Sequence, residues 1–165
     1  MKQIFLSIQS RLASLVPSLQ YIDKNWNQLN LPQPPVKWPC CLIDLDNIDY
    51  SMAAHRTRLA EASIILTIAD HHTVRSSALA PSKTAAYDIL DLIEDIITAL
   101  DGWCIPNTTQ SLVRTRLAKA YSDQSYDVYT LTFSSAWVEH IQQIQQEGQT
   151  IQASPSIAVR LDIPD

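Results

Sequence analysis

The sequence predicts an α+β fold, in which one antiparallel sheet of four to five strands is covered on one face by two main helices. Two segments carry apolar residues at helical spacing, and several others alternate apolar and polar residues as strands do. Few connections are long enough for a parallel crossover, so the strands should pair antiparallel. With 165 residues, 46% of them hydrophobic, the chain is expected to form a single domain, 1–165, with its own core.

The first helix is expected to begin near the N-terminus and to end before Pro17. Its apolar face comprises Ile4, Phe5, Ile8, Leu12, Leu15 and Val16. A short strand at 19–22 should follow. Four of the nine prolines lie between 25 and 39, so residues 23–38 are interpreted as an irregular, proline-rich surface loop.

Two strands are predicted next, one from Pro39 to about Asn47 and one over 60–69. In the first, Cys41, Ile43 and Leu45 share one face and Asp44 and Asp46 the other. The second is rich in β-branched residues. The pair is expected to form a hairpin with a long polar loop at 47–58.

The most regular pattern predicts a helix from 82 to 101. Its apolar face comprises Ala86, Ile89, Leu90, Ile93, Ile96, Ile97 and Leu100. Pro81 and Ser82 mark its start, and Gly102 marks its end.

Two further strands, 112–121 and 126–135, should form a hairpin through the polar turn 122–125. Residues 137–165 are treated as a C-terminal extension. In it, Trp137, Ile141 and Ile144 have helical spacing, whereas Ile157, Val159 and Leu161 alternate as in a strand.

No familiar catalytic or phosphate-binding motif occurs, so we expect no enzyme activity and no cofactor. Asp44, Asp46 and Asp49 are the best candidates for metal ligands or for an enzyme's carboxylates, and a solvated strand face is the alternative. His71 and His72 should lie in a loop. The odd cysteine count, with Cys40 and Cys41 adjacent and Cys104 distant, favours buried free thiols over disulfides or a zinc site.

The net charge of −5, without a run of Lys or Arg, argues against a protein held on nucleic acid mainly by counterion release. We expect no sequence-specific binding of nucleic acid, and no membrane-spanning stretch is evident. Charge is nevertheless segregated. Asp88, Asp91 and Asp95 lie on the predicted helix, whereas Arg114, Arg116 and Lys119 lie on the strand that follows it. These surfaces are either solvated, or pair within one subunit, or meet between copies arranged head to tail in a ring.

The order of elements resembles that of the tail terminator and tail-completion proteins of long-tailed bacteriophages and prophages. The resemblance covers residues 1–136 and includes an acidic helix ending in ALDGW, a basic strand beginning LVRTR, and a Tyr126–Tyr129 segment of the form Tyr-Asp-x-Tyr. It implies a subunit that forms a ring, commonly a hexamer, which caps the tail tube and joins it to the head. It implies no catalysis.

The resemblance further implies three partners: other copies of the chain, a tail tube protein and a head-completion or connector protein. It also implies assembly in the bacterial cytoplasm and a final place in the virion neck. A head-to-tail adaptor, another minor tail protein and a monomeric binding module remain alternatives. In the proline-rich loop, large residues either anchor a partner or pack on their own core. These loop residues are Trp26, Leu29, Leu31 and Trp38.

Overall fold

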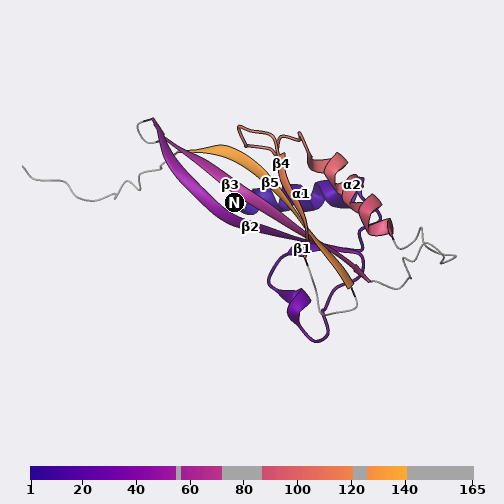
Figure 1. Cartoon of the computed structure of the whole chain (residues 1–165). Helices are drawn as coiled ribbons and strands as arrows, with labels where there is room; N and C mark the ends of the chain where they lie inside the picture. Colours follow the sequence, from indigo (N-terminus) through magenta and orange to yellow (C-terminus); the bar gives the residue numbers. More distant parts are fainter. Residues whose placement is uncertain (55–56, 72–86, 121–125, 141–165) are drawn as a thin grey trace, which may run out of the picture.

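The computed structural model describes residues 1–54, 57–71, 87–120 and 126–140 (Figure 1). In this part of the chain, five strands form one mixed sheet in the order β1-β2-β3-β5-β4, with two α-helices on one face. The elements are α1 (Lys2–Leu15), β1 (Tyr21–Lys24), the 3-10 helix η1 (Gln28–Asn30), β2 (Cys40–Ala54), β3 (Thr57–His71), α2 (Asp88–Leu100), β4 (Val113–Ala120) and β5 (Tyr126–His140). The α+β class predicted from the sequence is confirmed.

Both predicted helices form, and their apolar faces cover the sheet. On α1, Ile4, Ile8 and Leu12 are buried, but Leu15 is 52% exposed because it lies on the side away from the sheet. The α2 helix ends where predicted, and Gly102 follows it with a φ of 77°, a left-handed conformation that glycine adopts without strain. The predicted start at 82 lies outside the described residues.

Three predicted boundaries were wrong. The strand expected to end near Asn47 continues to Ala54, and its partner begins at Thr57, so the 47–58 loop is replaced by two long paired strands. Strand β1 includes Asp23 and Lys24, and η1 gives the proline-rich loop a short regular turn. Trp137 lies in β5, not in a helix, because the strand continues to His140 alongside β3.

The sheet is not wholly antiparallel. Strand β1 pairs parallel with β2, from Tyr21 opposite Cys40 to Lys24 opposite Ile43. Parallel pairing requires the chain to return to the end of the sheet at which β1 began. The connection through the proline-rich loop is long enough to do this, whereas a short hairpin turn is not. All other pairs are antiparallel, as expected.

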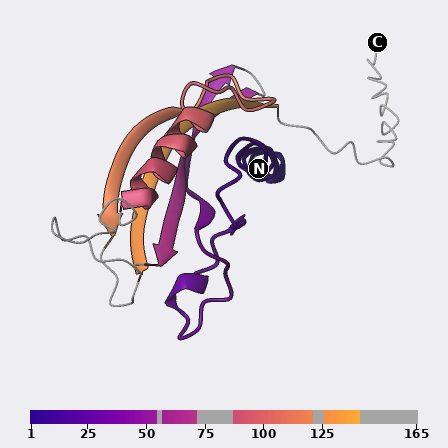
Figure 2. The same cartoon turned by 90° about the vertical axis from the view of Figure 1, so that its right-hand side faces the viewer.

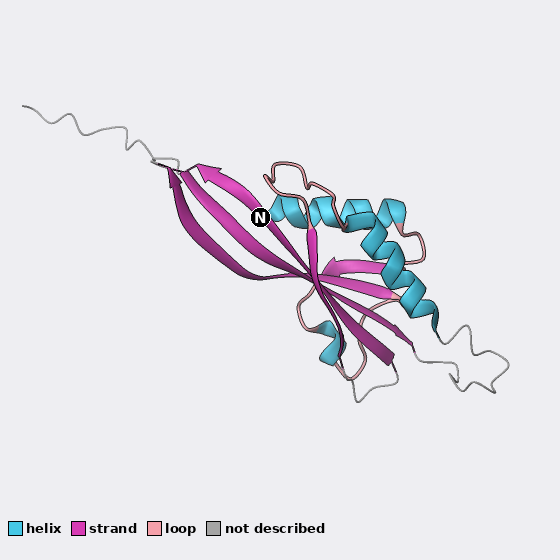
Figure 3. Cartoon of the chain, turned by 45° about the horizontal axis from the view of Figure 1, so that its top comes forward, coloured by secondary structure: helices cyan, strands magenta, loops and turns pink. Residues whose placement is uncertain are grey.

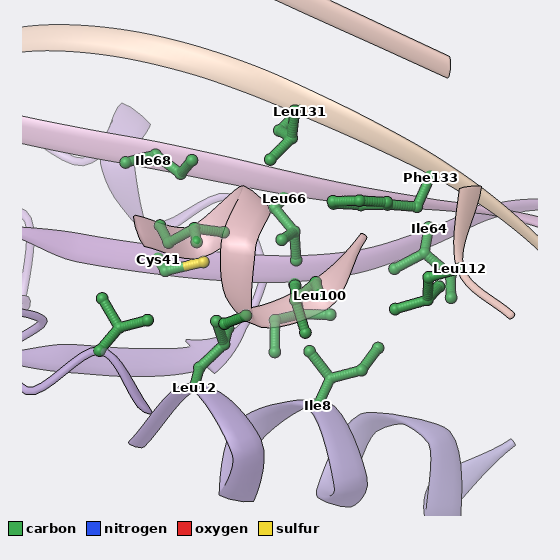
Figure 4. Close-up of a cluster of buried hydrophobic side chains, with 14 of the residues drawn as sticks. Ile8, Leu12, Cys41, Ile64, Leu66, Ile68, Leu100, Leu112, Leu131 and Phe133 are labelled. Atoms are coloured by element: carbon green, nitrogen blue, oxygen red, sulfur yellow. The ribbon is translucent and has the colours of Figure 1, made fainter. Parts of the chain in front are cut away.

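The main core lies between the helices and one face of the sheet (Figure 4). Ile8 and Leu12 of α1 and Leu100 of α2 meet Leu66 and Phe133 of the central strands, all with exposed fractions of 2% or less. We call this face of the sheet the helix-covered face and the other the opposite face. At 25 cal/mol per Å² of apolar surface, burying each such side chain stabilises the fold by roughly 1.5–3 kcal/mol.

The proline-rich loop covers one end of the opposite face. Leu29 packs there with Cys40, Leu42, Ala69 and Val128 in a second, smaller core. The hydroxyl of Tyr126 donates a hydrogen bond to the carbonyl oxygen of Leu29, which fixes the loop to β5. The loop is therefore part of the fold.

Strands β2, β3 and β5 continue together beyond the helices (Figures 1 and 3); in Figure 2 this extension points away from the viewer. We call this extension the arm; it comprises residues 46–54 of β2, 57–61 of β3 and 136–140 of β5. Along β2 nearly every arm residue is exposed, on both faces of the strand. On β3 and β5 the arm still contains buried residues, Ala60, Ala136 and Trp137, so the exposed part of the arm is its tip and its β2 edge.

We predict that Ile93→Asp unfolds the protein or destabilises it by roughly 3 kcal/mol or more, because Ile93 is buried between α2 and the sheet. The control is Leu90→Asp on the same helix, where Leu90 is 39% exposed and the cost should be about 1 kcal/mol or less. Urea denaturation followed by circular dichroism measures both. Equal stability of the two variants would show that the Ile93 face is not the buried one.

Candidate functional site

Strand β4 presents a basic surface at one edge of the sheet. Its sequence, VRTRLAKA, contains three cations and no acid, and residues 113–117 are exposed on both faces. Two of the cations have partners within the chain: Lys119 forms an ion pair with Asp127 at 2.8 Å, and Arg114 approaches Asp101 at 4.0 Å. Among the described residues, Arg116 takes part in no ion pair.

Helix α2 presents an acidic surface. Asp88, Asp91, Glu94 and Asp95 are all exposed, and no basic residue lies within the helix. Asp88 and Asp91 lie in the first turn, where the helix dipole favours negative charge. The structure therefore leaves both predicted charged surfaces accessible, and pairing within the subunit accounts for only part of the charge on β4. A role in subunit contacts stays a prediction.

The acids of β2 lie along the other edge of the sheet. The sequence predicts that Asp44 and Asp46 share one face, but the register shifts between Leu45 and Ile48, and this irregularity includes Asp46. Asp44 and Asp49 project from the opposite face of the sheet. Among the described residues, no three acids, histidines or cysteines lie close enough to hold a metal ion.

Asp49 lies directly opposite Glu61 of β3, and both side chains are exposed. They border a shallow polar hollow of about 370 Å³, which is also lined by Asn47, Ser63, Gln110, Ser134 and Ser135. Two carboxylates directly opposite each other on neighbouring strands repel each other. A cation at this position would relieve that repulsion.

The large residues of the proline-rich loop divide into two groups. Leu29 is buried by this chain's own residues, and Trp38 packs against the rings of His71 and Tyr126, with centroids 4.5 and 4.9 Å away. Trp26 and Leu31 remain 52% and 40% exposed. Only this second pair is available to a partner without rearrangement of the loop. The prediction that His71 lies in a loop was wrong, because β3 continues to His71 by pairing with Tyr126; His72 lies outside the described residues.

Sequence reasoning missed the exposed apolar residues of the arm. Tyr50 and Met52 are 46% and 71% exposed and project from the helix-covered face, beyond the reach of the helices. Leu117 of β4 is 48% exposed on the same face. The usable signal was the strand periodicity, which continues past Asn47 into Ile48, Tyr50 and Met52.

A shallow groove of about 440 Å³ runs along α1, lined by Leu6, Ser10, Leu15, Trp103 and Pro106, among others. Arg11 crosses it: its guanidinium lies 4.5 Å from the centroid of the Trp103 ring and donates a hydrogen bond to the carbonyl oxygen of Ala99. A cation at the C-terminal end of α2 is favoured by the helix dipole, so Arg11 fixes α1 to α2.

The cysteines are free thiols, as the sequence predicts. Burial raises the pKa of Cys40 to about 12, and burial raises the pKa of Cys41 further still. Both thiols therefore stay protonated at neutral pH and are poor nucleophiles. Cys104 is exposed.

The described residues thus form an α+β fold with an acidic surface on α2, a basic surface on β4 and exposed apolar residues on the arm. Compared with solved structures, it is similar to a chain of the "Virion of native gene transfer agent (GTA) particle", with a TM-score of 0.49 and 12% sequence identity over 81% of this chain and 92% of that chain. No family model matches the sequence, and no curated protein does. Neither described helix is long and apolar enough to cross a membrane.

We predict that a thiol reagent modifies one cysteine, Cys104, in the folded protein at pH 7 and all three after unfolding. Absorbance of the released thiolate measures the count, and Cys104→Ser should reduce the folded count to zero. Rapid labelling of two or three thiols in the folded protein would contradict the burial of Cys40 and Cys41.

We also predict that stability falls as the pH rises from 9 towards 12. The unfolded chain ionises the Cys40 thiol near its ordinary pKa of 9, whereas the folded chain keeps it protonated up to about 12. The stabilisation is complete below pH 9 and is lost as the pH rises through this window. Urea denaturation at several alkaline pH values should show a shallower decline for Cys40→Ala than for the unaltered protein.

Proposed function

We propose that this chain is a structural subunit of a long-tailed bacteriophage or prophage, and that it forms a ring that terminates the tail tube and joins it to the head. The resemblance of its element order to the tail terminator and tail-completion family supports this role. The geometry of the chain supports it independently.

The arm is the observation that carries the proposal. A three-stranded extension exposed along β2 on both faces leaves Tyr50 and Met52 without cover from the described parts of the chain. Tyr and Met are enriched at protein interfaces, where a partner removes their apolar surface from water. An arm of this kind suits a subunit that contacts neighbours beyond its own core.

The proposed action is geometric. A tube with rotational symmetry is best capped by a ring of the same symmetry, and contacts between unlike surfaces of one subunit close into such a ring when the rotation allows it. We propose further copies of this chain, a tail tube protein and a head-completion or connector protein as partners. Assembly would occur in the bacterial cytoplasm, and the mature location would be the virion neck. No catalytic step is proposed.

Two other functions are distinguishable by experiment. A head-to-tail adaptor would share the ring but bind the connector in preference to the tube. A metal-binding protein or enzyme using Asp44 and Asp46 would be stabilised by its ion, since a ligand that binds only the folded state raises the melting temperature. A rise of several degrees with millimolar Mg²⁺ or Mn²⁺ would favour this second class.

We predict that the purified protein forms rings, in solution or on tail tubes, and that Tyr50→Ser combined with Met52→Ser weakens assembly about tenfold or more. The reason is the loss of the apolar surface that the arm would bury. Sedimentation velocity across concentrations, negative-stain microscopy and co-sedimentation with tail tubes measure assembly.

The matched control is Leu6→Ser on α1, an equally exposed apolar residue at 43% that the proposal does not use. It should assemble like the unaltered protein. A chain that stays monomeric at high concentration and also fails to bind tail tubes would rule out the terminator role.

A further inference from the structure

The two edges of the sheet are each only partly covered by the described residues. At one edge, β1 pairs with 40–43 of β2 and leaves 44–54 unpaired on that side. At the other edge, the Gly102 N–H donates to the Leu112 carbonyl oxygen, and the Asp101 carboxylate accepts a hydrogen bond from the Arg114 N–H. Residues 115–120 of β4 are left open there.

These open edges carry opposite charge. The unpaired part of β2 contains Asp44, Asp46 and Asp49 and no Lys or Arg, whereas all the charged residues of β4 are cations. Charges on edge strands discourage pairing with other sheets. Here they disfavour contacts of like edges, β2 with β2 or β4 with β4, and leave the contact of unlike edges electrostatically favourable.

We propose that β4 of one copy pairs with the arm portion of β2 of the next copy, so that the sheet continues from subunit to subunit with Arg116 opposite Asp49. The inference rests on the proposed ring and names the contact that builds it. Within one sheet β4 runs antiparallel to β2, because each of the three pairings that link them is antiparallel. A neighbour that continues the sheet in the same direction therefore meets β4 in antiparallel pairing.

This register matches both faces of the sheet. Arg116 and Asp49 both project from the opposite face, since Arg116 pairs with Thr132 and Asp49 with Glu61. Antiparallel pairing then places Leu117 opposite Ile48, and both lie on the helix-covered face. Leu117 and Ile48 thus form an apolar pair on the helix-covered face, while Arg116 and Asp49 form a charged pair on the opposite face.

The Asp49–Glu61 pair provides an independent reason for a cation at this place. Directly opposed carboxylates destabilise an isolated arm, and among the described residues neither is in an ion pair. Arg116 is the cation of β4 that lacks an ion pair within its described chain. The neighbour's guanidinium, with donors in a planar fork, could bind both carboxylates at once.

The register also sets the displacement between neighbours. Through Thr132 and Ile65, Arg116 is level with Asp44 of its own chain, whereas Asp49 is level with Glu61. The step from Ile65 to Glu61 is four residues, or about 13 Å at 3.3 Å per residue. Such a stagger is what a sheet needs to close on itself with tilted strands.

Disulfide trapping tests the contact directly. In a Cys104→Ser background, the chain with Asp49→Cys and Arg116→Cys should give a ladder of covalent oligomers on mild oxidation, because each ring contact joins one thiol of each kind. Each single substitution should give only monomers on a non-reducing gel. The buried Cys40 and Cys41 should not contribute.

The control replaces the edge acid by a helix acid, with Asp91→Cys and Arg116→Cys in the same background. A ladder from this pair and none from the first would overturn the edge contact and leave the ring intact. A dimer band from Arg116→Cys alone would also overturn it, because like edges would then meet. Absence of rings and of tube binding in the unaltered protein would overturn the proposed function itself.

Charge exchange gives a second test that does not depend on cross-linking. Asp49→Arg alone and Arg116→Asp alone should each weaken ring formation roughly tenfold, because attraction becomes repulsion. The chain with both changes should recover it, and Asp91→Arg should have little effect. Unchanged assembly in both edge variants, with melting temperatures like that of the parent, would refute the pairing.

Discussion

The fold depends on the pairing of β3 on both of its sides. All fifteen residues of β3 pair with β5, and those from Thr57 to Ala69, except Ser63, also pair with β2. This ladder satisfies the backbone hydrogen bonds of the central strands whether or not a helix covers them. The helices and the proline-rich loop need to cover only part of the sheet, and the rest extends as the arm. A continuous central strand therefore allows the chain to have both a buried core and an extension that the helices do not cover.

The charged residues of the edge strands divide into those with and those without a partner in the described chain. Two cations of β4 have partners: Lys119 pairs with Asp127, and Arg114 lies near Asp101 at the end of α2. Such pairs between partly exposed groups contribute little to stability, about 0–1 kcal/mol each. Asp44, Asp46, Asp49 and Arg116 lie on open edges, where the main effect of charge is on which surfaces can meet. These charges therefore contribute little to folding, and we propose that they select the contact between neighbouring copies.

The sequence alone predicts the helices and strands whose apolar residues recur at a regular spacing. It fails where pairing with a distant strand holds residues of turn-like or helix-like sequence in an extended conformation. Helix α2 and the covered strand segments were recognisable because burial imposes an apolar pattern. The arm was not, since Asp46, Asn47 and Asp49 resemble a turn and pairing with β3 holds them in a strand. Trp137 was assigned to a helix because nothing local indicates that β3 continues beside it. The charged candidates were found, but the pairing of Asp49 with Glu61 depends on a register that no local pattern specifies.

Two shifts of strand register border one row of paired residues across the sheet. The register of β2 shifts just after Leu45, and that of β4 shifts just after Arg114; Leu45 and Arg114 are level with each other through Ile64 and Phe133. An extra residue bends a strand and increases its twist. The β2 bulge lies on the arm side of this row, between Ile64 and Ala62 of β3, whereas the β4 bulge lies on the other side of it, between Phe133 and Thr132 of β5. Arg116 and Asp49 follow directly after these bulges, each on its own edge. A local increase in strand twist therefore precedes each of the two side chains through which we propose that neighbouring subunits meet.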